Sequence, residues 1–301
     1  MKLQEIKGNL MLMLTALIWG CAFVAQSVSM DYIGPFTFQC IRSLMGSAVL
    51  VPVFLLLDHH KKRSGSYTLP TKNDRKTLWS AGLVCGCIMT IAANLQQIGI
   101  QYTTAGKAGF ITAMYILLVP VFGLFLHKKV APRVWICVLI SVVGLYLLSV
   151  TDGFSSIGKG DIYVLLCAVA FSFHIMAVDH YAPLVDGVRL SCIQFLICGV
   201  ISGVLMFLRE SPNLQSILNA AMPLCYSGIM SCGIAYTLQI IGQKYTRPAV
   251  ASLLMSLESV FAVLAGIVIL HEIPTSQETV GCILMFAAII LAQLPDKRIE
   301  N

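Results

Sequence analysis

Three ionisable side chains stand within long apolar stretches of this sequence, where a charge is costly. Glu258 lies roughly 14 Å along the stretch that begins at residue 249, at about 1.5 Å of helix rise per residue, and so near the middle of a bilayer. Arg42 and Lys107 lie closer to the ends of two other stretches. Because a charge inside a membrane must be paired or hydrated, each of the three is a candidate functional residue.

The chemistry open to these groups is ion binding and proton transfer. A carboxyl group at the depth of Glu258 can carry a proton or bind the amine of a substrate, and Arg42 can bind a carboxylate of the substrate or of Glu258 itself. Structural alternatives stay open: Glu258 can bond to nearby serines, and Lys107 can extend to the membrane surface. Protons are therefore a candidate partner beside a small-molecule substrate.

Uncharged polar and aromatic side chains recur at helical spacing in the same stretches. Two such stripes are Trp19, Phe23 and Gln26, and Asn94, Gln97 and Gln101. Lipid would not tolerate a polar stripe, so we expect these faces to line an interior cavity, although helix packing alone would also explain them. The predicted substrate-binding residues are Trp19, Arg42, Asn94, Gln97, Lys107, Tyr115, His174 and Glu258.

Other kinds of active centre lack their sequence signatures. The eleven cysteines are odd in number and lie in apolar stretches, and the pair Cys85 and Cys87 has no second pair with which to hold zinc. No second histidine follows His271 and Glu272 at metalloprotease spacing, and no Walker A phosphate-binding loop occurs. We therefore expect no metal, no cofactor, no enzyme and no ATP-driven pump. A channel or a receptor stays open as an alternative to a transporter.

The composition is typical of an integral membrane protein. Of the 301 residues, 57% are hydrophobic and 11% are charged, against roughly 25% charged residues in soluble domains. Apolar stretches of about 20 residues recur along the chain, and in lipid such stretches must form helices. The loops between them are too short for a soluble or nucleic-acid-binding domain. The ten predicted spans are 8–28, 35–57, 78–97, 103–126, 132–150, 161–178, 188–208, 221–242, 249–270 and 279–294.

Lysine and arginine in the short loops predict the orientation. With the N-terminus in the cytoplasm, 16 of the 20 basic residues fall on the cytoplasmic side, whereas only Lys159 and Arg209 fall outside. Arg42 and Lys107 lie within predicted spans. We therefore expect a multi-pass protein of the cell membrane with both termini in the cytoplasm.

The sequence repeats itself. Leu95–Thr103 overlays Leu238–Thr246 after a shift of 143 residues, and the two segments share their Leu, Gln, Ile, Gly, Tyr and Thr in the pattern LQxIGxxYT. The segment that starts at Gly8 overlays the one that starts at Gly160 after a shift of 152 residues, and a difference in loop length explains the change of shift. The two halves, 1–150 and 151–301, are predicted to be copies of one unit.

Each copy holds five predicted spans, and this odd number reverses the second copy in the membrane. Inverted repeats are typical of secondary transporters, whose substrate site lies near the midplane between the repeats. Arg42 overlays Gln194 and Tyr115 overlays Glu258, so the predicted site is chemically asymmetric. The sequence thus favours an all-α membrane protein that works by alternating access.

With its LQxIGxxYT pattern, the run Leu95–Pro120 resembles the EamA-type members of the drug/metabolite transporter superfamily, and so does Ser252–Ala262. The resemblance covers essentially the whole chain. One departure is Ser259, where this family commonly has proline, and it leaves open whether the helix breaks there.

This resemblance implies a basket of ten helices, in which spans five and ten are peripheral and the other eight surround a central cavity. It also implies transport of small metabolites, often amino acids and often outward, while other members move sugar derivatives or nucleotide conjugates. Substrate, direction, proton coupling and oligomeric state are not determined by these motifs.

Overall fold

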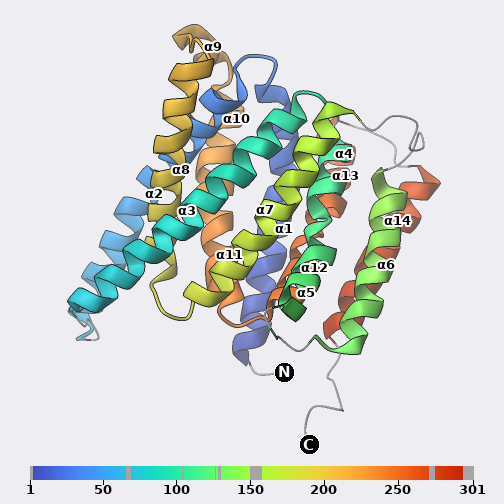
Figure 1. Cartoon of the computed structure of the whole chain (residues 1–301), viewed down its shortest axis with the longest axis horizontal. Coiled ribbons are helices and arrows are strands. Elements are labelled where there is room, and N and C mark those ends of the chain that lie inside the picture. The colour runs from blue at the N-terminus through green and yellow to red at the C-terminus, as the bar shows by residue number, and fades with distance from the viewer. Residues whose placement is uncertain are drawn as a thin grey trace, which may run out of the picture.

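The computed structural model describes residues 3–65, 69–103, 105–125, 127, 130–149, 158–270 and 275–293 (Figure 1). This part of the chain contains helices and no strand. The first half forms α1 (Leu3–Ser29), α2 (Pro35–Arg63), α3 (Lys72–Ile100), α4 (Ala105–Ala113), α5 (Tyr115–Phe125) and α6 (Pro132–Ser149). The second half forms α7 (Lys159–Tyr181), α8 (Gly187–Arg209), α9 (Leu214–Asn219), α10 (Ala221–Cys225), the π-helix η1 (Tyr226–Ala235), α11 (Tyr236–Gln243), α12 (Pro248–Met255), α13 (Glu258–Leu270) and α14 (Ser276–Gln293).

The helices have the length and surface of membrane-crossing segments. Within the described part of the chain, seven helical segments are long and apolar enough to span a bilayer, and three further apolar helices are shorter. Large apolar side chains such as Phe125, Phe207 and Leu208 are exposed, whereas polar ones such as Gln39 and Gln194 are fully buried. A soluble protein would show the opposite distribution, so the outer surface faces lipid. The predicted all-helical, multi-pass membrane protein is confirmed at this level.

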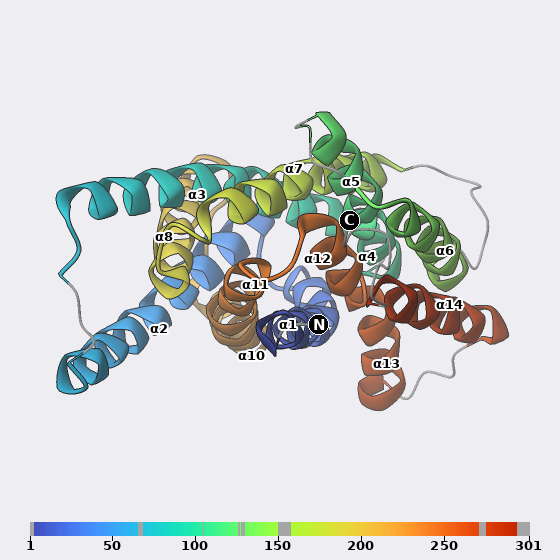
Figure 2. The ribbon, with the colours of Figure 1, turned by 90° about the horizontal axis from the view of Figure 1, so that it is seen from below.

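Two helices stand apart from the main bundle. Figure 2 shows α6 and α14 side by side at one edge, and the two pack against each other. They are the last helices of the two halves and overlay the fifth and tenth predicted spans. Their place at the periphery agrees with the family resemblance. Figure 1 also shows that α1 begins and α14 ends at the same edge of the molecule.

Two of the predicted spans are broken helices, and they break at equivalent positions. Met114 separates α4 from α5, and Ser256 with Leu257 separates α12 from α13. Met114 and Leu257 overlay under the shift of 143 residues, so Tyr115 and Glu258 each begin the second half-helix. The sequence predicted one span at each place and left open whether the second helix breaks near Ser259; both helices are interrupted. Paired interruptions in the two halves of a transporter are a structural marker of the binding site.

A serine hydroxyl explains the second break, which needs no proline. Ser256 Oγ donates to the Leu253 carbonyl at 2.8 Å, so this carbonyl is engaged by a side chain. In a regular helix the Leu257 N–H would bond to the same carbonyl, but it bonds instead to Leu254, one residue closer, at 3.3 Å. Such local bonding by serine bends helices. The Ser259 that replaces the family's proline is therefore compatible with a break.

The π-helix η1 interrupts a third predicted helix. It joins α10 to α11 within one membrane-length segment, Ala221–Gln243. The hydropathy of this segment predicts an ordinary helix, because it does not distinguish α from π hydrogen bonding. Short π segments often mark functional sites. Here the π-helix contains Ser231 and ends directly before Tyr236, and both residues line the cavity described below.

The long helices α2 and α8 pack against each other and are joined by a carboxylate contact at each end. At one end Glu210 caps α2: its Oε1 accepts from the Phe36 N–H at 2.9 Å, and its Oε2 accepts from the Thr37 N–H at 2.8 Å. At the other end Arg189 forms an ion pair with Asp58. Asp58 and Glu210 overlay under the shift of 152 residues. Equivalent positions of the two halves thus supply a carboxylate contact at each end of the pair.

Replacing Glu210 by alanine is expected to destabilise the protein by about 1–2 kcal/mol, the typical cost of losing a helix cap. The N–H groups of Phe36 and Thr37 would lose their acceptor, and the positive end of α2 would lose its counter-charge. Thermal unfolding in detergent measures the effect. Asp31→Ala is the control, since Asp31 is exposed in the loop just before α2. Equal melting temperatures for the two variants would contradict the capping role.

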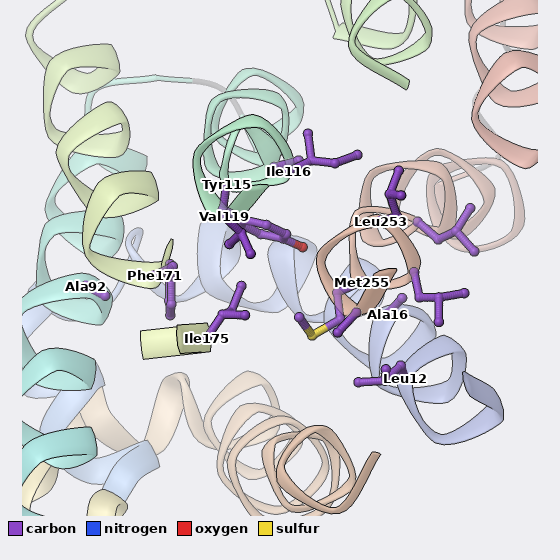
Figure 3. Packing of buried hydrophobic residues seen from close by; sticks show 14 of the residues in the cluster. Leu12, Ala16, Ala92, Tyr115, Ile116, Val119, Phe171, Ile175, Leu253 and Met255 are labelled. Atoms are coloured by element: carbon purple, nitrogen blue, oxygen red, sulfur yellow. The ribbon is translucent and has the colours of Figure 1, made fainter. Parts of the chain in front are cut away.

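The central core brings residues from both halves together. Figure 3 shows Leu12, Ala16, Tyr115, Ile175 and Met255, from four different helices, gathered around one interior space. The residue at the break in the first half, Tyr115, points its hydroxyl toward the helix that carries Leu253 and Met255. This meeting point of the two broken helices is where the site lies.

Candidate functional site

Tyr115 and Glu258 meet at the centre of the molecule. The Tyr115 hydroxyl donates a hydrogen bond to Glu258 Oε1 at 3.0 Å, and each residue is only 3% exposed. Because Glu258 stands in the first turn of α13, its carboxylate also lies at the positive end of that helix. These two contacts can hold a carboxylate in place at the wall of the cavity.

A cavity adjoins this pair. Its wall combines aromatic, aliphatic and polar side chains. The lining residues are Trp19, Phe23, Gln26, Arg42, Gln96, Thr112, Tyr115, Phe171, Ile175, Ser231, Tyr236, Gln239 and Glu258. Apolar walls with a few polar groups are typical of small-molecule sites.

Equivalent positions of the two halves contribute to the lining of the cavity. Four pairs of its lining residues occupy equivalent positions in the two halves. These pairs are Trp19 and Phe171, Phe23 and Ile175, Gln96 and Gln239, and Tyr115 and Glu258. The cavity is thus built from the same positions twice, but the two copies carry different chemistry at its centre.

Arg42 supplies the positive charge of the cavity. It is 2% exposed, its Nε donates to Gln39 Oε1 at 2.7 Å, and its guanidinium lies over the Phe38 ring at 5.1 Å. Within the described residues it forms no ion pair with a carboxylate, Glu258 included. The direct pairing of Arg42 with Glu258, one of the two predicted alternatives, is therefore not present. Both charges face the cavity instead.

Three buried polar atoms of the lining have no hydrogen-bond partner within the described part of the protein. They are Trp19 Nε1, Gln26 Oε1 and Gln239 Oε1. Buried polar atoms are nearly always bonded, to protein, water or a ligand, so these three can bond to a molecule in the cavity. The cavity therefore offers one donor and two acceptors in addition to the two charges.

Four of the eight predicted residues, Trp19, Arg42, Tyr115 and Glu258, line the cavity. Their grouping could be predicted because each stood out in a span by charge, by aromatic character or by repeat equivalence. They come from α1, α2, α5 and α13, which only the tertiary fold brings together.

Asn94 and Gln97 are buried away from lipid but do not line the cavity, contrary to our expectation. Asn94 Nδ2 donates to Ser202 Oγ of α8 at 2.8 Å, and Gln97 Nε2 donates to the Gln26 carbonyl of α1 at 3.3 Å. Both residues therefore join α3 to its neighbours. Their role in substrate binding stays a prediction.

His174 stands behind the cavity wall. Its Nε2 lies 3.1 Å from Gln194 Oε1, and its ring meets the edge of the Tyr236 ring at 6.3 Å between centroids. It can therefore position Tyr236, which does line the cavity. The side chain of Lys107 lies outside the described part of the structure.

Several lining residues were not predicted. Gln96 and Gln239 occupy the same place in the two LQxIGxxYT copies, and this repetition of a polar residue was a signal in the sequence. Thr112 accepts a hydrogen bond from Gln96 Nε2 at 3.2 Å. Tyr236 packs on Trp19 with ring centroids 4.5 Å apart. No sequence signal points to Tyr236, because the π-helix before it sets its direction.

Comparison with known proteins identifies the class. The model of the EamA-like transporter family matches residues 6–150 and again residues 158–294. The chain belongs to this family, as the sequence resemblance indicated. It is therefore a multi-pass membrane transporter of small molecules and not an enzyme.

The individual relatives agree with this class. An uncharacterized transporter of Archaeoglobus fulgidus is 28% identical over 97% of this chain and 87% of its own length. A WAT1-related chloroplast protein of Arabidopsis thaliana is 26% identical over 92% of this chain and 67% of its own length. A crystal structure, described only as that of a protein, superposes with a TM-score of 0.77 over 98% of this chain and 99% of its own. At 20% identity, that structure supports the fold alone.

Proposed function

We propose that this protein is a secondary transporter of small zwitterionic metabolites, namely amino acids or close relatives, and that it works by alternating access. One observation carries the proposal. A guanidinium and a carboxylate, those of Arg42 and Glu258, line one buried cavity without an ion pair between them. Two opposite charges held apart in a site of low dielectric are complementary to a molecule that carries both.

Each lining group then has a partner on the substrate. Arg42 binds the α-carboxylate, for which its planar guanidinium offers two parallel donors. Glu258 binds the ammonium group, whose remaining protons can reach Gln26 Oε1 or Gln239 Oε1. The substrate side chain lies against the aromatic wall around Trp19. In the absence of substrate, Glu258 can carry a proton, which makes proton exchange the proposed coupling.

We propose further that the chain forms ten spanning helices in two inverted repeats, 1–150 and 151–301. The support is the pairing of positions between the halves, which extends from the LQxIGxxYT copies to the two helix breaks. The peripheral pair α6 and α14 fits the same division. The substrate would bind on the axis between the repeats and reach each side in turn.

We also propose that the protein lies in the cell membrane with both termini in the cytoplasm, and the distribution of basic residues supports this orientation. Ser64, after α2, would then be cytoplasmic, and Ser211, after α8, would face outside. Single cysteines at these two exposed positions test the orientation when Cys225, which is also exposed, is replaced by serine. An impermeant maleimide applied to intact cells should label Ser211→Cys alone. Labelling of Ser64→Cys alone would reverse the orientation.

The experiment that tests the substrate class is a binding screen with the purified protein. Thermal shift and calorimetry would compare amino acids with two analogues of each ligand that binds, namely the amine without the carboxylate and the acid without the amine. We expect at least about tenfold weaker binding of either analogue, since each lacks one charged contact. Equal binding of all three forms, or binding of sugars or nucleotides alone, would contradict the proposal.

Transport itself is tested in reconstituted vesicles. Saturable uptake that is accelerated by substrate on the opposite side would support alternating access, and a response to a proton gradient would support proton exchange. Uptake with neither saturation nor counterflow would instead indicate a channel. We propose export as the direction of transport, because the sequence resembles a family whose members often export metabolites.

A further inference from the structure

At one edge of the molecule α1 and α11 touch through two glycines. A Cβ atom added to Gly8 would lie 2.9 Å from the Gly242 carbonyl oxygen, and one added to Gly242 would lie 2.9 Å from the Gly8 carbonyl oxygen. Beside them the Thr246 hydroxyl donates to Asn9 Oδ1 at 2.9 Å. The two backbones are therefore in direct contact, and any side chain larger than hydrogen would separate them.

The opposite edge carries the same arrangement between α3 and α7. A Cβ atom on Gly160 would lie 2.8 Å from the Gly99 carbonyl oxygen, and one on Gly99 would lie 3.0 Å from the Gly160 carbonyl oxygen. The Thr103 hydroxyl donates to Asp161 Oδ1 at 2.9 Å. In Figure 1 this contact lies at the upper edge, where α3 ends and α7 begins, and the first lies at the lower edge.

The two contacts are repeat equivalents of each other. Gly99 with Thr103 and Gly242 with Thr246 are the glycine and the final threonine of the two LQxIGxxYT copies. Their partners also overlay, because Gly160 and Asp161 follow Gly8 and Asn9 by 152 residues. Each motif copy therefore docks on the first helix of the other repeat, once at each membrane face.

From this geometry we propose that the two contacts are the gates of the transport cycle, both formed in the described structure and opened one at a time. The glycine contact of residues 8 and 242 closes the side on which α1 begins, and that of residues 99 and 160 closes the side on which α7 begins. Each joins one repeat to the other, so a rocking of the repeats breaks one and keeps the other. Each gate contains close backbone packing and a threonine hydrogen bond, and at the α7 edge Lys159 Nζ also lies 5.2 Å from the centroid of the Tyr102 ring.

The helices α2 and α8 are joined by a carboxylate contact at each end. We assign α2 and α8 to the part that stays together while the gates alternate. The proposal uses the alternating access of the proposed function and does not depend on the substrate class.

Substitution of the gate glycines tests the proposal without a substrate. Gly8→Ala should open the gate at the α1 edge, and Gly160→Ala should open the one at the α7 edge, because each methyl group meets backbone atoms of the partner helix. In Gly8→Ala, hydrogen–deuterium exchange of the purified full chain should become about tenfold faster in residues 5–12 and 240–247 and stay unchanged at the other edge. Gly160→Ala should accelerate exchange in residues 99–103 and 158–165 alone. Gly109→Ala is the control, since its added Cβ would meet nothing closer than 4.0 Å.

A gentler pair of variants covers the case in which an alanine variant fails to fold. Thr246→Val and Thr103→Val remove one hydroxyl each without adding bulk, and they should show the same two patterns at smaller amplitude. Exchange that rises at both edges in every variant, or at neither edge in folded protein, would overturn the gates. If no amino acid binds but each glycine variant still changes exchange at one edge only, the proposed substrate class is wrong and the gate proposal is supported.

Discussion

Replacement of Glu258 by glutamine is expected to weaken amino-acid binding by about 10- to 100-fold, because a hydrogen bond to a charged group contributes about 1.5–3 kcal/mol and each 1.4 kcal/mol is a factor of ten. Glutamine keeps the shape of the side chain and can still accept from the Tyr115 hydroxyl. The protein should therefore fold normally while the ammonium group of the substrate loses its counter-charge. Calorimetry with the purified variant measures the loss.

The matched acid, which has no amine, distinguishes substrate binding from a structural role. It never contacts Glu258 through an ammonium group, so its binding should change little in Glu258→Gln. Glu5→Gln, at an exposed position in the first turn of α1, is the control for loss of a negative charge. A folded Glu258→Gln protein with normal binding, transport rate and pH profile would end the functional assignment of Glu258.

Replacement of Arg42 by glutamine is expected to weaken amino-acid binding by a similar factor of about 10 to 100, through loss of the charge-assisted bond to the carboxylate. Glutamine is the residue that the second repeat carries at the equivalent position, Gln194, so the fold accommodates it in that setting. The preference for an amino acid over its matched amine should disappear together with the affinity.

Arg42→Lys provides an intermediate case. It keeps the charge but loses the planar pair of donors, so its affinity should fall between wild type and Arg42→Gln. Arg63→Gln, on the exposed end of the same helix, controls for net charge and should bind normally. An Arg42→Gln protein that keeps its preference for the carboxylate form would contradict the assignment.

Helices, their approximate limits and the repeat followed from the sequence alone. Hydropathy reports transfer from water to lipid, and each apolar stretch carries that information locally, without reference to its neighbours. The repeat was equally visible, since the same residues must serve the same packing role twice. Its alignment also pairs Tyr115 with Glu258, and these two side chains are hydrogen-bonded to each other in the folded protein.

Helical spacing predicted which residues are buried, but not against what. Asn94 and Gln97 do avoid lipid, yet they bond to α8 and α1 rather than face the cavity. A helix such as α3 has several protein neighbours, and the period of its polar face does not say which one a side chain meets. Only the arrangement of the neighbours decides this.

Only the tertiary structure decided where the helices around the cavity are interrupted and which side chains line it. The breaks before Tyr115 and Glu258 and the π-helix before Tyr236 are small changes in hydrogen bonding that hydropathy does not detect. Contacts between helices select them, because a shifted backbone bond costs little compared with the packing it permits. For the same reason, LQxIGxxYT is visible in the sequence as a repeated pattern, while its glycines acquire a role only when the other repeat lies against them.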